Sequence, residues 1–435
     1  MSNPLSPRPT ASGTAWRAVA LLMPVALLNY LDRQMLASMQ TSVMTDIPTI
    51  ETQENWGFML GQFKWVYAVV SLVGGYVADR FSRRLTVCAS LFVWSVVTGW
   101  TGQVTTYDEL LWARSLMGFS EAFYIPAALA LIADYHTGDT RSRAVGLHQM
   151  AIYGGVIAGG FGGYVAEIQT VQVQTVGRDG TVGGFAFDLG WRFAFTACGA
   201  VGMLYAVPLV LLLRDAPRVA PRSESPSPLD AGKELATNVS FLLLVLYFTL
   251  PAMAGWVVRD WMPSILKKEF GLGEGKAGVT ATIYWQSAAI LGAAAGGYLA
   301  DRWMRRSDRG RIFVSAIGMA LIVPAIFGIG NAGTLSVAVA FLILFGLGWG
   351  FFDCNNMPIL AQLVRAELRA TGYGVMNFVS ISVGGLADWG FGAMRDNKVP
   401  LHVSLNLFAG FAAVSVVLVL LIRPRPDFPA SEPTR

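Results

Sequence analysis

The sequence predicts an all-α membrane protein with twelve transmembrane helices in two pseudo-symmetric six-helix bundles. Three observations predict this fold: a strongly apolar composition, twelve apolar runs, and a charged motif that occurs once in each half. The 435 residues are 54% hydrophobic and 14% charged, with a mean hydropathy of +0.50. Soluble proteins carry about 25% charged residues. The composition therefore excludes an ordinary soluble enzyme.

A helix needs about 20 predominantly apolar residues to cross a bilayer. Twelve such runs follow one another between short polar breaks, six in residues 16–213 and six in residues 237–422. The predicted spans are 16–39, 56–77, 85–104, 110–133, 144–165, 193–213, 239–266, 277–300, 312–329, 335–363, 370–389 and 403–422. Residues 1–15 form a polar leader without a small-residue cleavage site, so we expect the first span to be retained.

Lys and Arg are distributed unevenly between the two sides of these spans. If the N-terminus is cytoplasmic, 21 of the 32 Lys and Arg residues lie on the inner side and seven on the outer side. Cytoplasmic loops are enriched in Lys and Arg. We therefore expect a multi-pass protein of the bacterial inner membrane with both termini cytoplasmic, including the tail 423–435. The net charge of +4 then reflects topology, and no nucleic-acid partner is expected.

The two halves share an internal repeat. Residues 214–236 are rich in Pro, Ser and charge, which is typical of a linker, and here a cytoplasmic one. The segment GGYVADRFSRR at 74–84 recurs as GGYLADRWMRR at 296–306, identical at eight of eleven positions. Each copy follows the second span of its half, which indicates duplicated six-helix units.

The repeated motif resembles the G-x-x-x-D-R-x-G-x-R signature of the major facilitator superfamily, and the resemblance covers essentially the whole chain. Its residues here are Gly75, Asp79, Arg80, Arg84, Gly297, Asp301, Arg302 and Arg306; Ser82 stands where the family prefers Gly. The resemblance implies two bundles related by an axis along the membrane normal, with the substrate site between them near the midplane. We expect Asp79, Arg80, Arg84, Asp301, Arg302 and Arg306 to gate the bundles. The arginines alone could also be a plain topology signal.

Several ionisable residues lie inside predicted spans, where each costs roughly 2.5 to 3.5 kcal/mol near a helix centre and therefore indicates function. In the first half they are Asp32, Arg33, Lys64, Arg114, Glu121 and His148. Arg114 and Glu121 are seven residues apart, so a helix places them two turns apart on one face. With both acids ionised, the first half has one surplus cation, which favours binding of an anion.

The segments NYLDRQ at 29–34 and ARSLMGFSEA at 113–122 resemble the anion:cation symporter branch of that superfamily. The resemblance implies that Asp32 and Glu121 carry protons and that Arg114 engages a substrate carboxylate. Arg33, an ionisable residue of the first span, is a further candidate for substrate binding. The planar guanidinium suits a carboxylate because it can bind both oxygens. The alternative is a structural Arg–Glu pair that only holds helices together.

Other candidates in the first half have open roles. Lys64 shares a face with Tyr67, so it either adds a second cationic contact to the anion or neutralises Asp32. His148, followed by Gln149, is either a proton relay that reaches the substrate or a packing residue.

The second half is poorer in charge and richer in neutral donors, which favours recognition of a polyhydroxy substrate. The candidate binding residues are Tyr284, Gln286, Asn355, Asn356 and Asn377, with a kink expected before Pro358. Asn377 shares a helix stripe with Asp388. Arg259 and Asp260 are either an outer gate or an ion pair at the membrane interface.

These features predict a secondary transporter: proton-coupled symport, by alternating access, of an organic anion such as a hexuronate, aldonate or sialic acid. The chain contains no HExxH, GxSxG or GxxxxGK motif, so no enzyme activity, metal or cofactor other than the coupling proton is expected. We expect a monomer. A spinster-like lysolipid or sphingolipid transporter is the main alternative, because Asp134, Asp139, Arg141 and Arg143 match its pattern after the fourth span. A non-coupled sugar facilitator is another.

Overall fold

The computed structural model describes residues 12–136, 139–168, 171–176, 182–187, 190–216 and 228–424. Most of the predicted leader and tail, and residues 217–227 of the predicted linker, lie outside these ranges. The first half contains α1 (Ser12–Ser38), α2 (Gln40–Asp46), α3 (Gln53–Arg80), α4 (Arg83–Thr101), α5 (Tyr107–Glu121), α6 (Tyr124–Tyr135), α7 (Asp139–Gly160), α8 (Gly162–Glu167), β1 (Val171–Val176), β2 (Val182–Phe187) and α9 (Gly190–Leu212).

The described residues of the second half form helices joined by short turns, without a strand. It contains α10 (Pro228–Thr237), α11 (Val239–Phe270), α12 (Glu274–Met304), α13 (Gly310–Gly330), α14 (Leu335–Asp353), α15 (Asn356–Leu363), η1 (Ala366–Leu368), α16 (Arg369–Asp396) and α17 (Leu401–Leu421). The antiparallel pair β1–β2, between α8 and α9, was not predicted from the sequence.

Each predicted span coincides with one long helix or with two short helices in succession. Eight helical segments of the described residues have the length and apolar composition to cross a membrane. The other four spans are α4, α7, α12 and α16, which have 19, 22, 31 and 28 residues. α7, α12 and α16 are less apolar because they pack against the opposite half, where small and polar side chains replace lipid-facing ones.

Two spans are interrupted in equivalent ways. α14 ends at Asp353 and α15 begins at Asn356, two residues before Pro358, as predicted. α5 ends at Glu121 and α6 begins at Tyr124, two residues before Pro126, which was not predicted. Proline lacks the N–H that an uninterrupted helix needs. Both interruptions place polar residues within a span, away from its ends.

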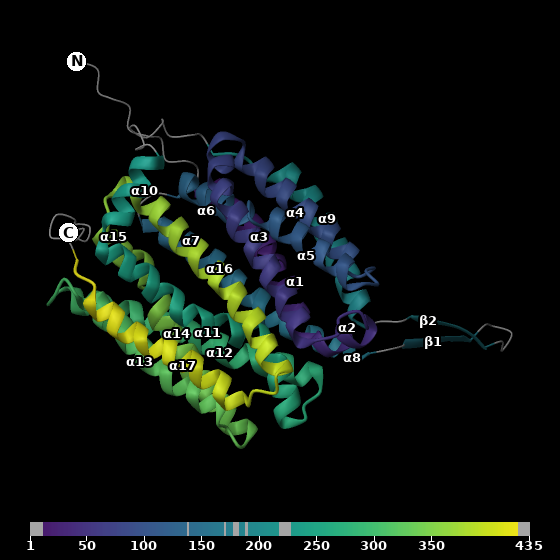
Figure 1. Cartoon of the computed structure of the whole chain (residues 1–435). Helices are drawn as coiled ribbons and strands as arrows, with labels where there is room; N and C mark the ends of the chain where they lie inside the picture. Colours follow the sequence, from purple (N-terminus) through teal and green to yellow (C-terminus); the bar gives the residue numbers. More distant parts are fainter. Residues whose placement is uncertain are drawn as a thin grey trace, which may run out of the picture.

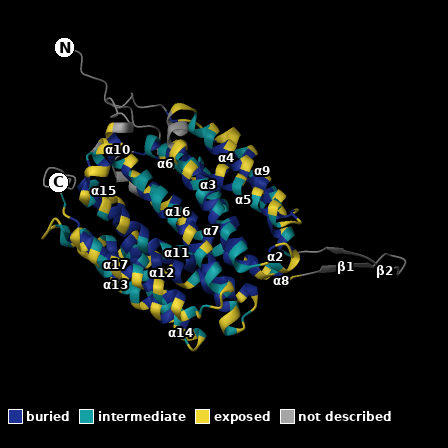
Figure 2. Cartoon of the chain, viewed as in Figure 1, coloured by how far each residue is buried: buried dark blue, intermediate teal, exposed yellow. Residues whose placement is uncertain are grey.

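The packing of the first half recurs in the second (Figure 1). α1 packs on α7 as α11 packs on α16, and α4 packs on α9 as α13 packs on α17. Exposed side chains occupy the outward sides of the helices, whereas buried ones lie where helices meet (Figure 2). The duplicated motif thus accompanies duplicated helix packing.

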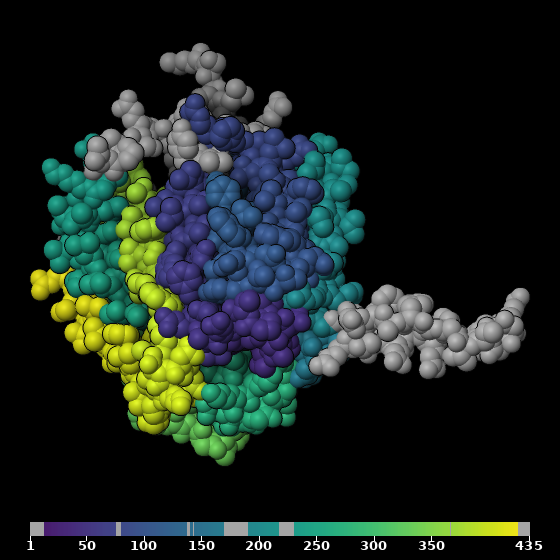
Figure 3. Space-filling model, turned by 45° about the vertical axis from the view of Figure 1, so that its right-hand side comes forward, coloured from purple at the N-terminus to yellow at the C-terminus, as the bar shows by residue number. Residues whose placement is uncertain are grey.

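The halves contact each other through α3 with α16, through α7 and α8 with α12, and through α1 with α11. Figure 3 shows α16 directly beside α3. We call the side of the molecule with α2 the α2 face, and the opposite side, where Ser12 and Pro424 lie, the terminal face. A Cβ at Gly57 of α3 would lie 2.3 Å from the carbonyl oxygen of Asp388. Only glycine permits this backbone approach near the α2 face.

Candidate functional site

Arg33 and Glu121 form a buried ion pair in the first half. The Arg33 Nε donates to the Glu121 Oε2 at 2.6 Å, and the two side chains are 9% and 0% exposed. The Arg33 guanidinium also lies 4.9 Å from the ring centre of Tyr67 and 4.7 Å from that of Phe63. Aromatic faces stabilise a cation away from water. Two predicted site residues, Arg33 and Tyr67, therefore line the same place.

Arg114 lies beside this pair and has no carboxylate within ion-pair distance among the described residues. Its guanidinium lies 4.4 Å from the centre of the Phe63 ring, its terminal nitrogen contacts the Met117 sulfur at 2.9 Å, and its Nε has no hydrogen-bond partner. A buried unpaired cation is costly. Arg114 therefore retains unused capacity to bind an anion.

Asp32 completes the buried charges of the first half. Its Oδ2 accepts a hydrogen bond from the Thr98 hydroxyl at 3.1 Å, whereas its Oδ1 and the Glu121 Oε1 have no partner. Asp32 interacts electrostatically with Glu121, Arg114 and Arg33. The structure thus brings together two carboxylates and two guanidiniums that the sequence selected from two different spans.

Lys64 is directed toward the second half. Its Nζ forms ion pairs with Asp388 and, at 2.5 Å, with the Asp260 Oδ2, and it lies 4.4 Å from the centre of the Trp256 ring. Lys64 and Asp388 are buried, with side chains 4% and 0% exposed. Lys64 pairs with these acids of α11 and α16, and not with Asp32. No role for Asp388 was predicted from the sequence, although its position on the Asn377 stripe was a signal.

Arg259 lies next to this cluster. Its Nε is 4.0 Å from the Asp260 Oδ1, and its guanidinium lies 4.9 Å from the centre of the Tyr30 ring of the first half. Tyr30 also contacts Arg33, at 5.1 Å. Arg259 and Asp260 therefore lie between the halves. Asp260 is shared with Lys64 of the first half, so Arg259 and Asp260 are not an isolated pair.

His148 is buried within the first half. Its Nε2 lies 2.9 Å from the Tyr124 hydroxyl, which also donates to the Leu22 carbonyl at 3.1 Å. These contacts favour the packing role over a relay. Gln149, the next residue, is partly buried.

The neutral candidates of the second half differ in their surroundings. Both polar atoms of the Asn356 side chain and the Gln286 Oε1 are buried without a partner, whereas the Asn355 amide donates to the Phe351 carbonyl at 3.0 Å. Asn377 is partly buried. Tyr284 is 42% exposed, on one side of α12 with Leu291 and Tyr298. Asn356 and Gln286 therefore have the most unused hydrogen-bonding capacity of this set.

The gating residues predicted from the repeated motif lie at the terminal face. The backbone N–H of Arg84 donates to the Asp215 carboxylate at 2.9 Å within the first half, and the Arg311 guanidinium lies 3.5 Å from the Asp301 carboxylate within the second half. Arg80, Arg302 and Arg306 are exposed, and the side chain of Asp79 lies outside the described residues. The bonds of Arg84 and Asp301 each stay within one half, so they do not join the halves in this arrangement.

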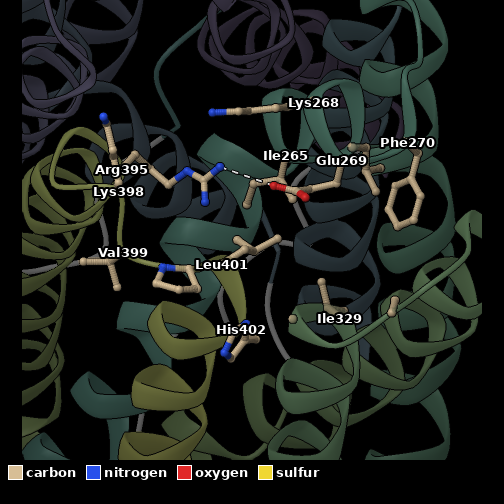
Figure 4. A pocket seen from close by; sticks show the side chains of 14 residues that line it. Ile265, Lys268, Glu269, Phe270, Ile329, Arg395, Lys398, Val399, Leu401 and His402 are labelled. Atoms are coloured by element: carbon tan, nitrogen blue, oxygen red, sulfur yellow. Dashed lines mark hydrogen bonds and ion pairs between the residues drawn. The ribbon is translucent and has the colours of Figure 1, made fainter.

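Two cavities occur at the α2 face. One, of about 490 Å³, lies between the halves and is lined by residues of α2, α11 and α16, including Lys267 and Arg395. The other, of about 470 Å³, lies within the second half and is lined by Lys268, Glu269, Arg395, Lys398 and His402, with Glu269 paired to Arg395 at 3.3 Å (Figure 4). These cavities were not predicted from the sequence. Among the described residues, no cluster of His, Cys, Asp and Glu is placed to hold a metal.

Residues 22–387 match the family model of the Major Facilitator Superfamily. The chain belongs to this superfamily. The predicted family, the twelve-span fold and the expectation of a transporter rather than an enzyme are therefore confirmed. Proteins of this superfamily bind small molecules within the membrane, and the polar clusters described above lie there.

The relatives of this superfamily member include a hexuronate transporter and spinster proteins, the two kinds that the sequence led us to expect. It is 27% identical over 417 residues to an MFS-type efflux pump of Mycolicibacterium smegmatis, covering 94% of this chain and 89% of that protein. It is 25% identical to protein spinster of Drosophila melanogaster, covering 85% and 60%, so it spans less than two thirds of that longer protein. It is 22% identical to the hexuronate transporter of Bacillus subtilis, covering 95% and 96%.

Solved structures share the fold. A bacterial homolog of the human lysosomal transporter spinster has a TM-score of 0.78 at 20% identity, covering 95% of this chain and 98% of that one. The D-xylose-proton symporter has a TM-score of 0.72 at 16% identity, covering 95% and 98%.

Proposed function

We propose that the protein is a proton-coupled symporter of an organic anion, such as a hexuronate, aldonate or sialic acid. Transport proceeds by alternating access, with the terminal face cytoplasmic in a bacterial inner membrane. The observation that carries this proposal is the buried Arg114, which lacks a carboxylate among the described residues and lies beside the Arg33–Glu121 pair. A bound carboxylate would supply the missing partner.

Proton coupling is supported by the two buried acids. Asp32 and Glu121 each have one oxygen without a hydrogen-bond partner, and both interact electrostatically with the guanidiniums that would hold the anion. A proton on either acid weakens its hold on a guanidinium and so increases the attraction for an anionic substrate. Binding of proton and anion thereby favour each other.

The polar candidates of the second half support a hydrophilic substrate. Asn356 and Gln286 offer buried, unpartnered groups that hydroxyls of a sugar acid would satisfy. The full-length relationship to the Bacillus subtilis hexuronate transporter points the same way. The gating role of the terminal-face motifs belongs to this proposal, because Asp79 and Asp301 hold equivalent positions in the two halves.

A spinster-like lysolipid transporter is the second candidate, favoured by the relationship to spinster proteins. Vesicles containing the purified protein separate the two. An inward proton gradient is expected to accumulate labelled glucuronate, gluconate or sialic acid inside the vesicles. Movement of lysolipid with no accumulation of any of these sugar acids would overturn the symport proposal. Uptake of the neutral sugar glucose that only equilibrates, without response to the gradient, would indicate a facilitator.

A further inference from the structure

We propose that Lys64 alternates between the substrate anion and the carboxylates of Asp388 and Asp260, and that these carboxylates take up a proton when Lys64 leaves them. This inference rests on the proposed anion–proton symport and adds a second proton site, in the second half of the chain. It also gives one residue, Lys64, a part in both gating and anion binding.

We call this alternation of Lys64 between the substrate anion and the two carboxylates the Lys64 switch. It lies where the two halves contact each other. Lys64 projects from α3, Asp260 from α11 and Asp388 from α16, and Lys64 contacts both acids. At the next residue of α3, the Trp65 Nε1 donates to the Ser382 carbonyl of α16 at 2.9 Å. Toward the α2 face, the Trp389 Nε1 donates to Glu54 at 3.0 Å. The ion pairs therefore form only while α3 and α16 are together.

The balance of buried charges determines when the α2 face opens. In the closed arrangement, Lys64 and Arg259 balance Asp260 and Asp388, while Arg33 and Arg114 balance Asp32 and Glu121. If α3 separates from α16, Lys64 leaves one uncompensated positive charge in the first half. The cluster of Asp260, Asp388 and Arg259 then keeps one uncompensated negative charge. Isolated charges away from bulk water are costly, so a substrate anion near Lys64 and a proton on Asp388 or Asp260 favour opening of the α2 face.

The surroundings of Asp388 limit which groups contribute. α3 presents Lys64 and, toward the α2 face, Glu54. α11 presents Asp260 with Arg259 behind it and, at its α2-face end, Glu269, which is paired with Arg395 of α16. α17 packs on the other side and carries one ionisable residue, His402, at its α2-face end. α15 carries none, and η1 adds only Glu367 at the opposite end of α16. Lys64 is therefore the cation that Asp388 loses on opening.

Closure then releases the substrate. When Lys64 returns to Asp388 and Asp260, the proton leaves for water and the first half returns to electrical neutrality. The anion loses one of its three cations and is held more weakly by Arg33 and Arg114. Its release follows toward the terminal face, because the α2 face is closed by the same ion pairs.

Distances between spin labels across the α2 face test the switch without any substrate. The labels replace Thr45 of α2 and Asn397 beyond α16, which are exposed residues of opposite halves. Asp388→Asn and Lys64→Gln are expected to raise the ratio of long to short distances at least about tenfold, since each breaks a buried pair. Lys64→Arg keeps the charge and is expected to stay mostly closed. Lys276→Gln, an exposed lysine of α12, is the matched control and should resemble the parent protein.

The same distance measurement at different pH values tests the proposed proton uptake. Because the open state binds a proton that the closed state lacks, the long-distance population of the parent protein should rise as the pH falls. Asp260→Asn/Asp388→Asn should be open at every pH. Unchanged distances in Lys64→Gln and Asp388→Asn, or an equal pH response in the double variant, would overturn the switch.

Transport measurements distinguish a failure of this inference from a failure of the symport proposal. With glucuronate as the probe, the logarithm of accumulation is plotted against the pH gradient, and its slope in Asp388→Asn is expected to fall by one proton per anion. An unchanged slope would refute the second proton site. If the parent protein fails to accumulate any sugar acid, the proposed function fails, and the distance measurements still decide whether the Lys64 switch exists.

Discussion

Arg114 combines burial with the absence of a carboxylate partner among the described residues, whereas Arg33 is paired with Glu121. The two guanidiniums therefore have different parts in the proposed site. Arg33 is held in place by its ion pair and by aromatic rings. Arg114 has a free hydrogen-bonding group, so we expect it to gain the strongest new interaction when an anion binds.

Arg114→Met tests this difference. Loss of the charge should weaken glucuronate binding by roughly 100-fold, since a buried charged hydrogen bond contributes about 2 to 5 kcal/mol. The melting temperature without ligand should fall only slightly, because Arg114 offsets the charges of Asp32 and Glu121 but forms no ion pair with a carboxylate among the described residues. Thermal-shift titration measures both quantities. A large loss of stability without ligand, with binding preserved, would instead indicate a structural arginine.

Glu121→Gln tests the proton role proposed for the Arg33 partner. The neutral amide cannot release a proton, so gradient-driven accumulation of glucuronate in vesicles should be lost. Exchange of labelled for unlabelled glucuronate requires no net proton movement and should persist. Full accumulation by this variant would remove Glu121 from the coupling role.

At the scale of helices, backbone contact between α3 and α16 decides whether the α2 face closes. Gly57 lies against the Asp388 carbonyl, and Gly61 against that of Gly385. These contacts bring Lys64 to its acids. The helix interruptions before Pro126 and Pro358 act at the same scale, because each ends a helix at an acidic residue, Glu121 or Asp353.

Gly57→Val should separate the two helices. Its Cβ would lie 2.3 Å from the Asp388 carbonyl oxygen, so the helices must move apart or the closed state is lost. The long-distance population between labels at Thr45 and Asn397 should increase. Gly390→Ala is the control on α16, since a Cβ there meets nothing within 4 Å. Equal distance distributions in the two variants would show that this contact does not control closure.

At the scale of the whole molecule, the proposed orientation places the terminal face in the cytoplasm. A cysteine at Asn397, at the α2 face, should react with a membrane-impermeant maleimide in intact bacterial cells. A cysteine at Asp308, at the terminal face, should react only after the membrane is permeabilised. The three natural cysteines are replaced first, because two of them are only partly buried. The opposite labelling pattern would invert the topology.

Much of the fold could be predicted from the sequence because its causes are local or repeated. Apolar runs define the helices, and the copy of residues 74–84 at 296–306 identifies the duplication. Asp32, Arg33, Arg114 and Glu121 could be selected individually because a charge within an apolar run is visible without coordinates. The β1–β2 pair was missed because it has no strong local hydropathy signal. The interruption after Glu121 was missed although Pro126 gives the same local signal as Pro358.

The number of spans, the repeat, the family and the few charges within spans could be inferred from the sequence alone, because hydropathy and spacing act along the chain. The pairing of those charges depends on the packing of helices that are far apart in the sequence. Lys64 reaches acids 196 and 324 residues away, and the sequence alone favoured neither of its two predicted roles. That pairing depends on which helices of the two halves touch, and backbone contact at Gly57 and Gly61 selects α16 as the neighbour of α3.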